Sequence, residues 1–331
     1  MNSPYQEIIS RLGVNRVLIN EILKKYTSIK IGGPSDLFFK AGNSKDLVNA
    51  LTIAEKFKVN YFVLGGGTNI IFPDKGFRGL VIKNESADIC FKGLTGRRFT
   101  KSKTNSYVDK VYLEVDSGVS INRLVRNTVE QGLSGLEYFL GQPGTVGGAI
   151  WINAHNLKQG KFFGDTLVSA RIYRPQKGII EVPRGYFRFN YDRSVIQKTK
   201  DIVLTVTISL LKNNKDKLWT IAKQALDYRQ KTQPSGSLTA GCLFRNIEKS
   251  QAIRLTTPNY TCSAGFLLEA VGLKGKTIGN IMFSDKHANF LINKGEAKFS
   301  DVLKLIDLAR NKIRKKFSVN LELEVVLVDE I

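Results

Sequence analysis

Two glycine-rich segments are the parts of this sequence whose residue types and spacing could do chemistry. The first, YFVLGGGTNIIF (61–72), places Gly65, Gly66 and Gly67 between two apolar stretches. Consecutive glycines let neighbouring main-chain N–H groups curl around an anion such as a phosphate. Thr68 and Asn69 follow directly and could add side-chain donors. A tight hairpin is the alternative interpretation of the same residues.

A dinucleotide-binding GxGxxG turn is excluded for this segment. That turn leads from a strand into a helix, whose N-terminus meets the pyrophosphate. Here the glycines have a different spacing, and Ile70, Ile71 and Phe72 after them are typical of a strand. If the segment binds a phosphate, it does so in a bend between two strands.

A second glycine cluster lies in GLSGLEYFLGQPGTVGGAIWIN (132–153), where four glycines flank a turn-forming proline: Gly141, Pro143, Gly144, Gly147 and Gly148. The residues after the turn could start a helix, whose free N–H groups would face whatever lies in the bend. A third piece, YTSIKIGGPSDLFF (26–39), adds Gly32 and Gly33 before Pro34. Together the clusters suit a large, flat ligand that carries phosphates.

The composition is that of a globular protein with a strong positive charge. The 331 residues include 50 basic and 29 acidic side chains, a net charge of +21. Such a surplus suits either a nucleic-acid binder or an enzyme with diphosphate ligands. The basic residues are spread along the chain, with only short clusters at 94–105 and 309–317. We therefore expect a solvated basic surface and no nucleic-acid partner.

Metal, disulfide and membrane sites are not expected. Cys90, Cys242 and Cys262 are scattered without a CxxC, and the chain has only two histidines, so neither a metal site nor a structural disulfide is predicted. No apolar run approaches the roughly 18 residues that span a bilayer, and the N-terminus lacks a signal-peptide pattern. We expect a cytoplasmic protein, with a monomer as the simplest state.

Helical and strand patterns alternate without a regular βαβ rhythm, which favours an α+β fold over a doubly wound sheet. Apolar spacing predicts helices at 45–58, 120–132, 218–231, 264–272 and 300–317, the second with Ser120 as its N-cap and Gly132 at its end. Strands are predicted at 61–65, 69–72, 79–83, 110–118, 167–174, 201–211, near 280–283 and 289–293, and at 321–328. The stretch 91–110 indicates a solvated loop or a long hairpin, and the polar run 212–217 indicates a domain boundary.

The order of seven motifs resembles the UDP-N-acetylenolpyruvoylglucosamine reductase (MurB) family from about residue 20 to residue 328. The motifs are YTSIKIGGPSDL, LGGGTNII, GFRGLVI, GLSGLEYFLGQPGTVGGAIWINA, SAGFLLEAVGLKG, DKHANFLIN and LELEVVLV. Each motif is weak by itself, whereas their joint order is specific.

The resemblance implies a two-lobed FAD-binding module of the vanillyl-alcohol-oxidase (PCMH) type and a C-terminal α+β substrate-binding domain. Lobe 1 would span 1–85 and be joined by the final strand at 321–331, lobe 2 would span 86–212, and the substrate-binding domain 213–320. The glycine platforms would then hold FAD. The implied cofactor-binding residues are Gly65, Gly66, Gly67, Thr68, Asn69, Gly141, Pro143, Gly144, Thr145, Gly147, Gly148 and Asn153.

The resemblance also implies an activity, the reduction of UDP-N-acetylglucosamine enolpyruvate to UDP-N-acetylmuramate for peptidoglycan synthesis. NADPH would reduce the flavin first, and the reduced flavin would then pass hydride to the substrate while a protein acid supplies a proton. A further group must polarise the substrate carboxylate. Two alternatives remain at this point: a flavoprotein oxidase acting on a sugar or alcohol, and a basic binding protein that keeps the fold without the chemistry.

The implied proton donor is Cys242, which stands in AGCLFRN where relatives have the serine of GSxFxN. A thiol is mostly protonated at neutral pH and is a stronger acid than a hydroxyl. The ordinary alternative is a small buried cysteine. The implied acidic partner is Glu324 in NLELEVV. Glu322 would share its strand face by alternation, so only the alignment separates the two carboxylates.

The implied carboxylate-polarising residue is Arg193. The family arginine lies in YRxS, whereas this chain reads NYDRS, with Asp192 in the usual place and Arg193 one residue later. Successive strand residues face opposite sides, so the shift by one residue bears directly on this assignment.

Substrate contacts are expected from residues that match the family by position: Tyr228, Arg229, Asn246, Lys286, His287 and Asn289. Tyr228 and Arg229 could contact the diphosphate or the sugar, and no acid–base role is assigned to His287. No covalent histidyl–flavin link is expected at His155. The segment 247–262 is longer than in short relatives and would either rim the substrate channel or elaborate the surface.

Overall fold

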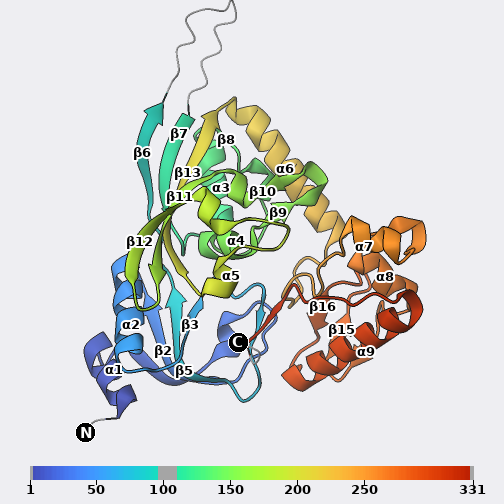
Figure 1. Cartoon of the computed structure of the whole chain (residues 1–331), viewed down its shortest axis with the longest axis horizontal. Coiled ribbons are helices and arrows are strands. Elements are labelled where there is room, and N and C mark those ends of the chain that lie inside the picture. Colours follow the sequence, from blue (N-terminus) through green and yellow to red (C-terminus); the bar gives the residue numbers. More distant parts are fainter. Residues whose placement is uncertain (1–2, 96–109, 329–331) are drawn as a thin grey trace, which may run out of the picture. The chain divides into compact units, whose positions relative to one another are not determined.

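The structure is a computed structural model that describes residues 3–95 and 110–328 (Figure 1). The chain forms two compact units. Unit 1 contains Met1–Leu18, Leu37–Gly66 and Gly79–Tyr228, and unit 2 contains Ile19–Asp36, Gly67–Arg78 and Arg229–Ile331. Helices and strands are mixed without a βαβ repeat, so the predicted α+β class is confirmed. The predicted three-part division into two lobes and a third domain stays a prediction.

The helices of unit 1 are α1 (Pro4–Leu12), α2 (Ser44–Lys56), α3 (Ile121–Glu130), α4 (Val146–Ile152), α5 (Ile196–Thr199) and most of α6 (Lys215–Thr232). Its strands are β3 (Tyr61–Leu64), β6 (Ile89–Thr95), β7 (Lys110–Asp116), β8 (Leu133–Ser134), β9 (His155–Asn156), β10 (Lys161–Phe162), β11 (Leu167–Arg174), β12 (Gly178–Pro183) and β13 (Ile202–Lys212). Three strands run from one unit into the other along the chain: β1 (Val17–Ile22), β2 (Pro34–Ala41) and β5 (Phe77–Asn84).

A large antiparallel sheet organises unit 1, in the order β12-β11-β13-β7-β6, with β8 paired to β13 (Figure 1). Along β7, Val111, Leu113 and Val115 are buried, while Tyr112 and Glu114 lie on the opposite face. This period of two is what a sheet with one core face and one solvated face requires. The core face packs against α3 and α4.

Helix α3 follows the predicted pattern at both ends. Ser120 accepts a hydrogen bond from the Arg123 N–H at 3.2 Å, which satisfies one of the free donors of the first turn. Gly132 has φ +67°, a conformation that favours glycine, just after the helix ends. The buried positions Ile121, Leu124, Val125, Thr128 and Val129 form one helical stripe. The helix predicted at 120–132 is confirmed.

A second core in unit 1 lies between α1, α2 and neighbouring strands. Leu47 and Leu51 of α2 belong to it together with Leu80 and Ile82 of β5. Strand β3 pairs in parallel with β5, so that Tyr61 lies opposite Leu80 and Leu64 opposite Lys83. The first glycine segment therefore begins directly after the pair formed by the buried Leu64 and the half-buried Lys83.

Unit 2 contains α7 (Lys249–Arg254), α8 (Ala264–Ala270) and α9 (Phe299–Phe317), with strands β4 (Ile70–Ile71), β14 (Thr277–Ile278), β15 (Ile281–Phe283), β16 (Leu291–Asn293) and β17 (Val326–Leu327). The strands β14-β15-β16 form an antiparallel sheet, and β17 pairs in parallel with β4. The core includes Ile29, Ile31 and Ile71, so early segments of the chain are built into this unit.

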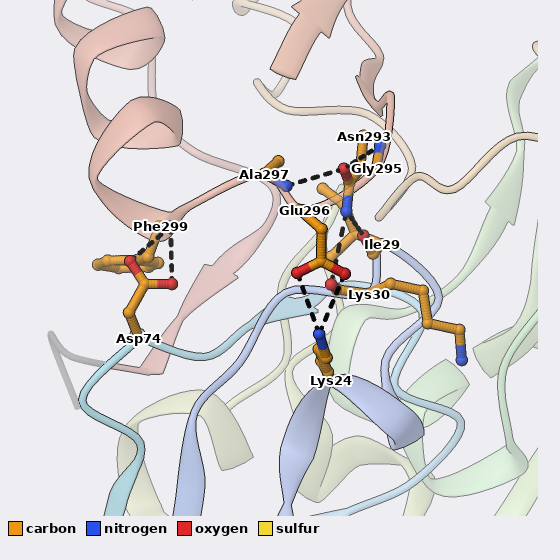
Figure 2. A network of polar contacts seen from close by, with 9 residues as sticks. All are labelled: Lys24, Ile29, Lys30, Asp74, Asn293, Gly295, Glu296, Ala297 and Phe299. Atoms are coloured by element: carbon orange, nitrogen blue, oxygen red, sulfur yellow. Dashed lines mark hydrogen bonds and ion pairs between the residues drawn. The ribbon is translucent and has the colours of Figure 1, made fainter. Parts of the chain in front are cut away.

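Polar contacts fasten these early segments to the C-terminal part of unit 2 (Figure 2). The Asp74 carboxylate accepts from the Phe299 N–H at 3.0 and 3.1 Å and so caps α9, whose own N-cap residue offers no side-chain acceptor. The Asn293 amide donates to the Ile29 carbonyl at 2.9 Å, and Lys24 pairs with Glu296 at 3.2 Å.

Two sequence predictions need comment. The strand predicted at 321–328 is wrong in extent, because only Val326 and Leu327 have regular pairing and residues 324–325 form a bend. For the stretch 91–110, β6 and β7 pair antiparallel up to Thr95 and Lys110, and residues 96–109 lie outside the described part of the chain. None of the helices within 3–95 and 110–328 has the length and apolarity needed to cross a membrane.

The cap of α3 gives a direct test of this local structure. Ser120 is exposed, so Ser120→Ala removes the cap without opening a cavity and should lower the free energy of unfolding by about 1 kcal/mol in urea denaturation. Arg126→Ala on the exposed face of the same helix is the control, with an expected change below about 0.5 kcal/mol. Equal effects of the two changes would contradict the capping role.

Candidate active site

Gly65 and Gly66 of the first glycine platform contact Thr145 and Gly144 of the second within unit 1. A Cβ atom at Gly65 would lie 2.6 Å from the Thr145 Oγ1, and one at Gly66 would lie 2.8 Å from the Gly144 Cα. Both distances are shorter than real Cβ contacts, and the second neighbour is main chain that cannot rotate away. Glycine is therefore required at Gly66, where two backbones meet, whereas a side chain at Gly65 would displace the Thr145 hydroxyl.

Several main-chain donors of these platforms remain available. Among the residues that the structure describes, the N–H groups of Gly66, Gly67 and Thr68 donate to no protein acceptor, and neither do those of Gly144 and Thr145. Native proteins rarely leave such groups without a partner. Consecutive N–H groups of this kind suit the oxygens of a phosphate or diphosphate.

The turn before α4 is held open by its own conformation. Gly141 and Gly144, on either side of Pro143, have φ +83° and +111°, values that only glycine adopts easily. The Gly141 N–H donates to the Asn122 Oδ1 at 2.7 Å, which fixes the start of the turn.

The first N–H groups of α4 were predicted to be free, and this prediction is wrong. Val146 and Gly147 donate to main-chain oxygens of the 117–119 turn at 2.9 and 2.8 Å, and Gly148 donates to the Thr145 Oγ1 at 3.5 Å. The helix start packs against a neighbouring turn, which uses these donors internally.

Two predicted cofactor contacts use their side chains within the protein. The Asn153 amide donates to the Asn190 carbonyl at 3.1 Å and accepts from the Gly164 N–H at 3.2 Å. The Asn69 amide donates to the Glu324 carbonyl at 3.0 Å. Their places in the structure are thus explained by the hydrogen bonds that they make to the backbone.

Lys83, from the part of β5 in unit 1, is a residue that no sequence motif indicated. Its Nζ donates to the Gly65 carbonyl oxygen. Burial lowers the pKa of the Lys83 ammonium from its ordinary value. The signal in the sequence was a single lysine in the otherwise apolar stretch GLVIK.

In unit 2 the segment after Gly241 lies between two others and positions the predicted proton donor. The backbone of Cys242 forms an isolated antiparallel β-bridge with that of Phe290, and the Leu243 N–H donates to the Asn289 carbonyl at 2.7 Å. On the other side the Glu324 N–H donates to the Leu243 carbonyl at 2.9 Å. Cys242 and Glu324 are therefore brought close by main-chain hydrogen bonds.

Arg229 completes this group. Burial lowers the pKa of its guanidinium, and the charges of Cys242 and Glu324 oppose that shift. One of its nitrogens, Nη1, donates to the Gln233 Oε1 at 3.0 Å. A cation, a thiol and a carboxylate thus lie within mutual electrostatic reach in unit 2.

The structure separates the two carboxylates that strand alternation could not. Glu322 has a side chain that is 63% exposed, and it lies 3.8 Å from the Arg245 guanidinium. Residues 321–325 are not a regular strand, although Leu323 forms an isolated β-bridge with Phe244, and the shared face of Glu322 and Glu324 stays a prediction.

The side chains of Asn246 and Asn289, two predicted substrate contacts, form hydrogen bonds with the backbone of neighbouring segments. The Asn289 side chain accepts from the Phe244 N–H at 2.9 Å and donates to the Phe244 carbonyl at 2.7 Å. The Asn246 Oδ1 accepts from the Ala264 N–H at 3.0 Å at the start of α8.

His287 and Lys286 are also engaged within unit 2. The His287 Nδ1 accepts from the Asn289 N–H at 3.2 Å, and burial lowers the pKa of its ring, so both observations favour the neutral form. The Lys286 Nζ donates to the Gln230 carbonyl at 2.6 Å.

Comparison with known proteins places this geometry in a family. A family model described as "FAD binding domain" matches residues 35–182, and one described as "UDP-N-acetylenolpyruvoylglucosamine reductase, C-terminal domain" matches 233–328. The UDP-N-acetylenolpyruvoylglucosamine reductase of Halalkalibacterium halodurans is 34% identical over 324 residues, which cover 98% of each chain. The enzyme of that name from Bacillus subtilis is 34% identical over 329 residues, 99% of each chain.

The chain belongs to the UDP-N-acetylenolpyruvoylglucosamine reductase family. A crystal structure of the reductase from Thermus caldophilus superposes with a TM-score of 0.70 at 27% identity, covering 94% of this chain and 97% of that one. The predicted resemblance is confirmed, and so is the predicted combination of an FAD-binding domain with a reductase C-terminal domain.

This member of the reductase family departs from the YRxS motif in a way that the structure makes concrete. Arg193 is exposed in unit 1, and its main chain closes a turn with Asn190 at 3.0 and 3.2 Å. Asp192, which takes the place of the motif's arginine, is fully buried and has φ +51°. The Asp192 Oδ1 lies 3.2 Å from the His155 Nδ1.

The Asp192 turn is fastened to the end of α4. The Ser194 hydroxyl and the Gln197 amide donate to the Trp151 carbonyl at 2.6 and 2.9 Å. Both Asp192 carboxylate oxygens lack a hydrogen-bond donor in the described part of the chain, so the imidazole of His155 is the partner that the fold offers them.

Tyr228, a predicted substrate contact that is also in unit 1, is 41% exposed, and the Lys158 ammonium lies over its ring, 4.1 Å from the ring centroid.

Removing the His155 imidazole should therefore lower the free energy of unfolding more than removing the Asp192 carboxylate. His155→Phe removes the polar partner of the buried Asp192 carboxylate and should lower the free energy of unfolding by about 3 kcal/mol. Asp192→Asn removes the buried carboxylate and leaves an amide beside the imidazole, with an expected change below about 1 kcal/mol.

Urea denaturation of the wild type, the two single variants and the double variant would measure this asymmetry. The double variant should recover part of the loss caused by His155→Phe. Strictly additive effects would contradict a coupled pair.

Proposed function

We propose that the protein catalyses the NADPH-dependent, FAD-mediated reduction of UDP-N-acetylglucosamine enolpyruvate to UDP-N-acetylmuramate for peptidoglycan synthesis. The observation that carries this proposal is the likeness to named reductases over 98–99% of the chain. The grouping of Cys242, Arg229 and Glu324 in unit 2 supports it independently, because it supplies the charges that the reaction needs. The cytoplasm remains the proposed location.

The platform amides provide the fit for the cofactor. In unit 1, both glycine segments would hold FAD through the free N–H groups of Gly66, Gly144 and Thr145. Gly67 and Thr68, in unit 2, also have N–H groups that donate to no acceptor among the described residues and stay proposed cofactor contacts. The buried Gln142 Oε1, which has no donor among the described residues, offers an acceptor in the second segment. When bound, FAD supplies the hydride transfer that links NADPH to the substrate. The proposed two FAD lobes, 1–85 and 86–212, would contribute these segments.

Cys242 would give its proton to the carbon of the substrate double bond next to the carbon that receives the hydride. The thiolate that remains would be stabilised by Arg229, because a negative charge on Cys242 interacts favourably with that guanidinium. Glu324 would hold or relay charge near the substrate carboxylate, since the same guanidinium lies within its reach. Donation of the Glu324 and Leu243 N–H groups to neighbouring carbonyls fixes this arrangement before any ligand binds.

The role proposed for Arg193, which is exposed, is polarisation of the substrate carboxylate. Arg229, Lys286, His287, Asn246, Asn289 and Tyr228 would surround or support the substrate. Because Asn246 and Asn289 clamp the backbone around Cys242, their contribution would be to position the thiol.

The proton-donor role has a clear kinetic signature. Cys242→Ala should leave anaerobic bleaching of the flavin by NADPH within about threefold of wild type and lower product formation by at least about 100-fold. Stopped-flow absorbance separates the two half-reactions.

Cys242→Ser is the matched variant, because it keeps an acidic hydrogen at the same position. Its turnover should exceed that of Cys242→Ala. If Cys242→Ala turns over at the wild-type rate, another group donates the proton. Rapid reoxidation by oxygen with no response to the enolpyruvyl substrate would instead favour the oxidase alternative.

The contact between the glycine platforms predicts a cofactor phenotype. Gly66→Ala places a methyl group against the Gly144 main chain and should weaken FAD binding by at least about tenfold, because the two backbones must separate. Fluorescence titration of flavin-free protein would measure the dissociation constant.

Gly185→Ala is the control, since a Cβ atom there meets nothing within 4 Å and the residue has no positive φ. It should change FAD affinity by less than about twofold. A wild-type affinity in Gly66→Ala would show that the platform does not carry the cofactor.

A further inference from the structure

We infer that Lys83 binds the anionic diphosphate of the cofactor at the point where the two glycine platforms meet. The inference rests on the proposed function and deepens it, because it adds a side chain that would bind the diphosphate of FAD. Lys83 lies outside the sequence motifs, since the motif GFRGLVI ends at Ile82.

The position of Lys83 is fixed by the sheet. Val81 and Ile82, just before it in β5, are fully buried, and Lys83 lies opposite Leu64 in the parallel pairing with β3. Gly65 is the residue that follows Leu64, and the Lys83 Nζ donates a hydrogen bond to its carbonyl oxygen.

The charge of Lys83 lacks a carboxylate counter-ion within residues 3–95 and 110–328. The nearest candidate by sequence, Glu85, is paired with Lys40 at 3.5 Å. Burial lowers the pKa of Lys83, and the field of Glu85 only opposes that shift. A half-buried ammonium without an anion is costly unless a ligand supplies the negative charge.

The surroundings of Lys83 identify the kind of anion. Gly65, whose carbonyl it contacts, lies against Thr145, so the ammonium stands beside both platforms of unit 1. The free N–H groups of Gly66, Gly144 and Thr145 belong to the same platforms. An ammonium has three N–H donors, and the contact with Gly65 uses one of them. Two donors remain for the oxygens of a diphosphate.

The competing explanation is a purely structural one, in which Lys83 only tethers the bend at Gly65. The two explanations differ in their dependence on phosphate. Riboflavin has the same ring system as FAD and carries no phosphate, so a diphosphate-binding lysine should matter for FAD and not for riboflavin.

The experiment measures the dissociation constants of FAD and riboflavin for flavin-free wild-type protein and for Lys83→Met, by fluorescence titration at several salt concentrations. We expect Lys83→Met to weaken FAD binding by about 30-fold and riboflavin binding by less than about threefold. The salt dependence of FAD binding should also become shallower in Lys83→Met, because one phosphate contact is lost.

Two further variants separate a local contact from the general field. Lys83→Arg keeps the charge and should bind FAD more tightly than Lys83→Met. Lys40→Met removes a neighbouring cation that is paired with Glu85 and should change FAD affinity by less than about threefold.

Thermal unfolding of the flavin-free proteins gives an independent readout. Because Lys83→Met removes a desolvated charge without a counter-ion, it should leave the melting temperature unchanged or raise it, whereas a structural tether would lower it. A lowered melting temperature together with equal losses for FAD and riboflavin would overturn the inference. Unchanged FAD affinity in Lys83→Met would overturn it alone, whereas a wild type that takes up no FAD would overturn the proposed function as well.

Discussion

The close approach of two main chains at Gly65–Gly66 and Gly144–Thr145 is the constraint on which unit 1 depends. No side chain beyond a hydrogen fits where the Gly66 Cα faces the Gly144 Cα. The same absence of side chains leaves N–H groups of both segments without protein acceptors. Rigid strands and capped helices on either side, such as β3 and α3, hold the two backbones at this separation. A phosphate-binding surface built from main chain is therefore a consequence of packing, and its chemistry does not depend on which side chains surround it.

Unit 2 uses the opposite strategy, with side chains held by a dense set of backbone hydrogen bonds. The segment Cys242–Phe244 is paired on one side with residues near Asn289 and on the other with residues near Glu324. The Asn289 side-chain amide accepts from the Phe244 N–H and donates to the Phe244 carbonyl. These two hydrogen bonds restrict the movement of the segment that carries Cys242. The proposed donor is thus positioned before a substrate arrives, which is where the rate advantage of an enzyme's acid originates.

Charges that are only partly compensated concentrate in three places, and each has a different structural origin. Arg229 faces a thiol and a carboxylate in unit 2. Asp192 is buried against His155 in unit 1, at the position where the family motif has an arginine. Lys83 donates to the Gly65 carbonyl oxygen and has no carboxylate partner among the residues that the structure describes. Buried polar groups are normally satisfied within a fold, so such exceptions are most easily understood as positions that await a ligand or that replace another residue's charge.

The sequence by itself determined the fold class, the family and the ends of α3, because periodicity, capping residues and motif order are local properties of the chain. It also identified both glycine clusters and the segment around Cys242. Only the tertiary structure decided which donors stay free. The first amides of α4 are used by a turn that is distant in sequence, and the Asn153 amide is used by Asn190. It also separated Glu322 from Glu324 and brought Lys83 to Gly65, because burial and pairing across the chain leave no trace in local spacing.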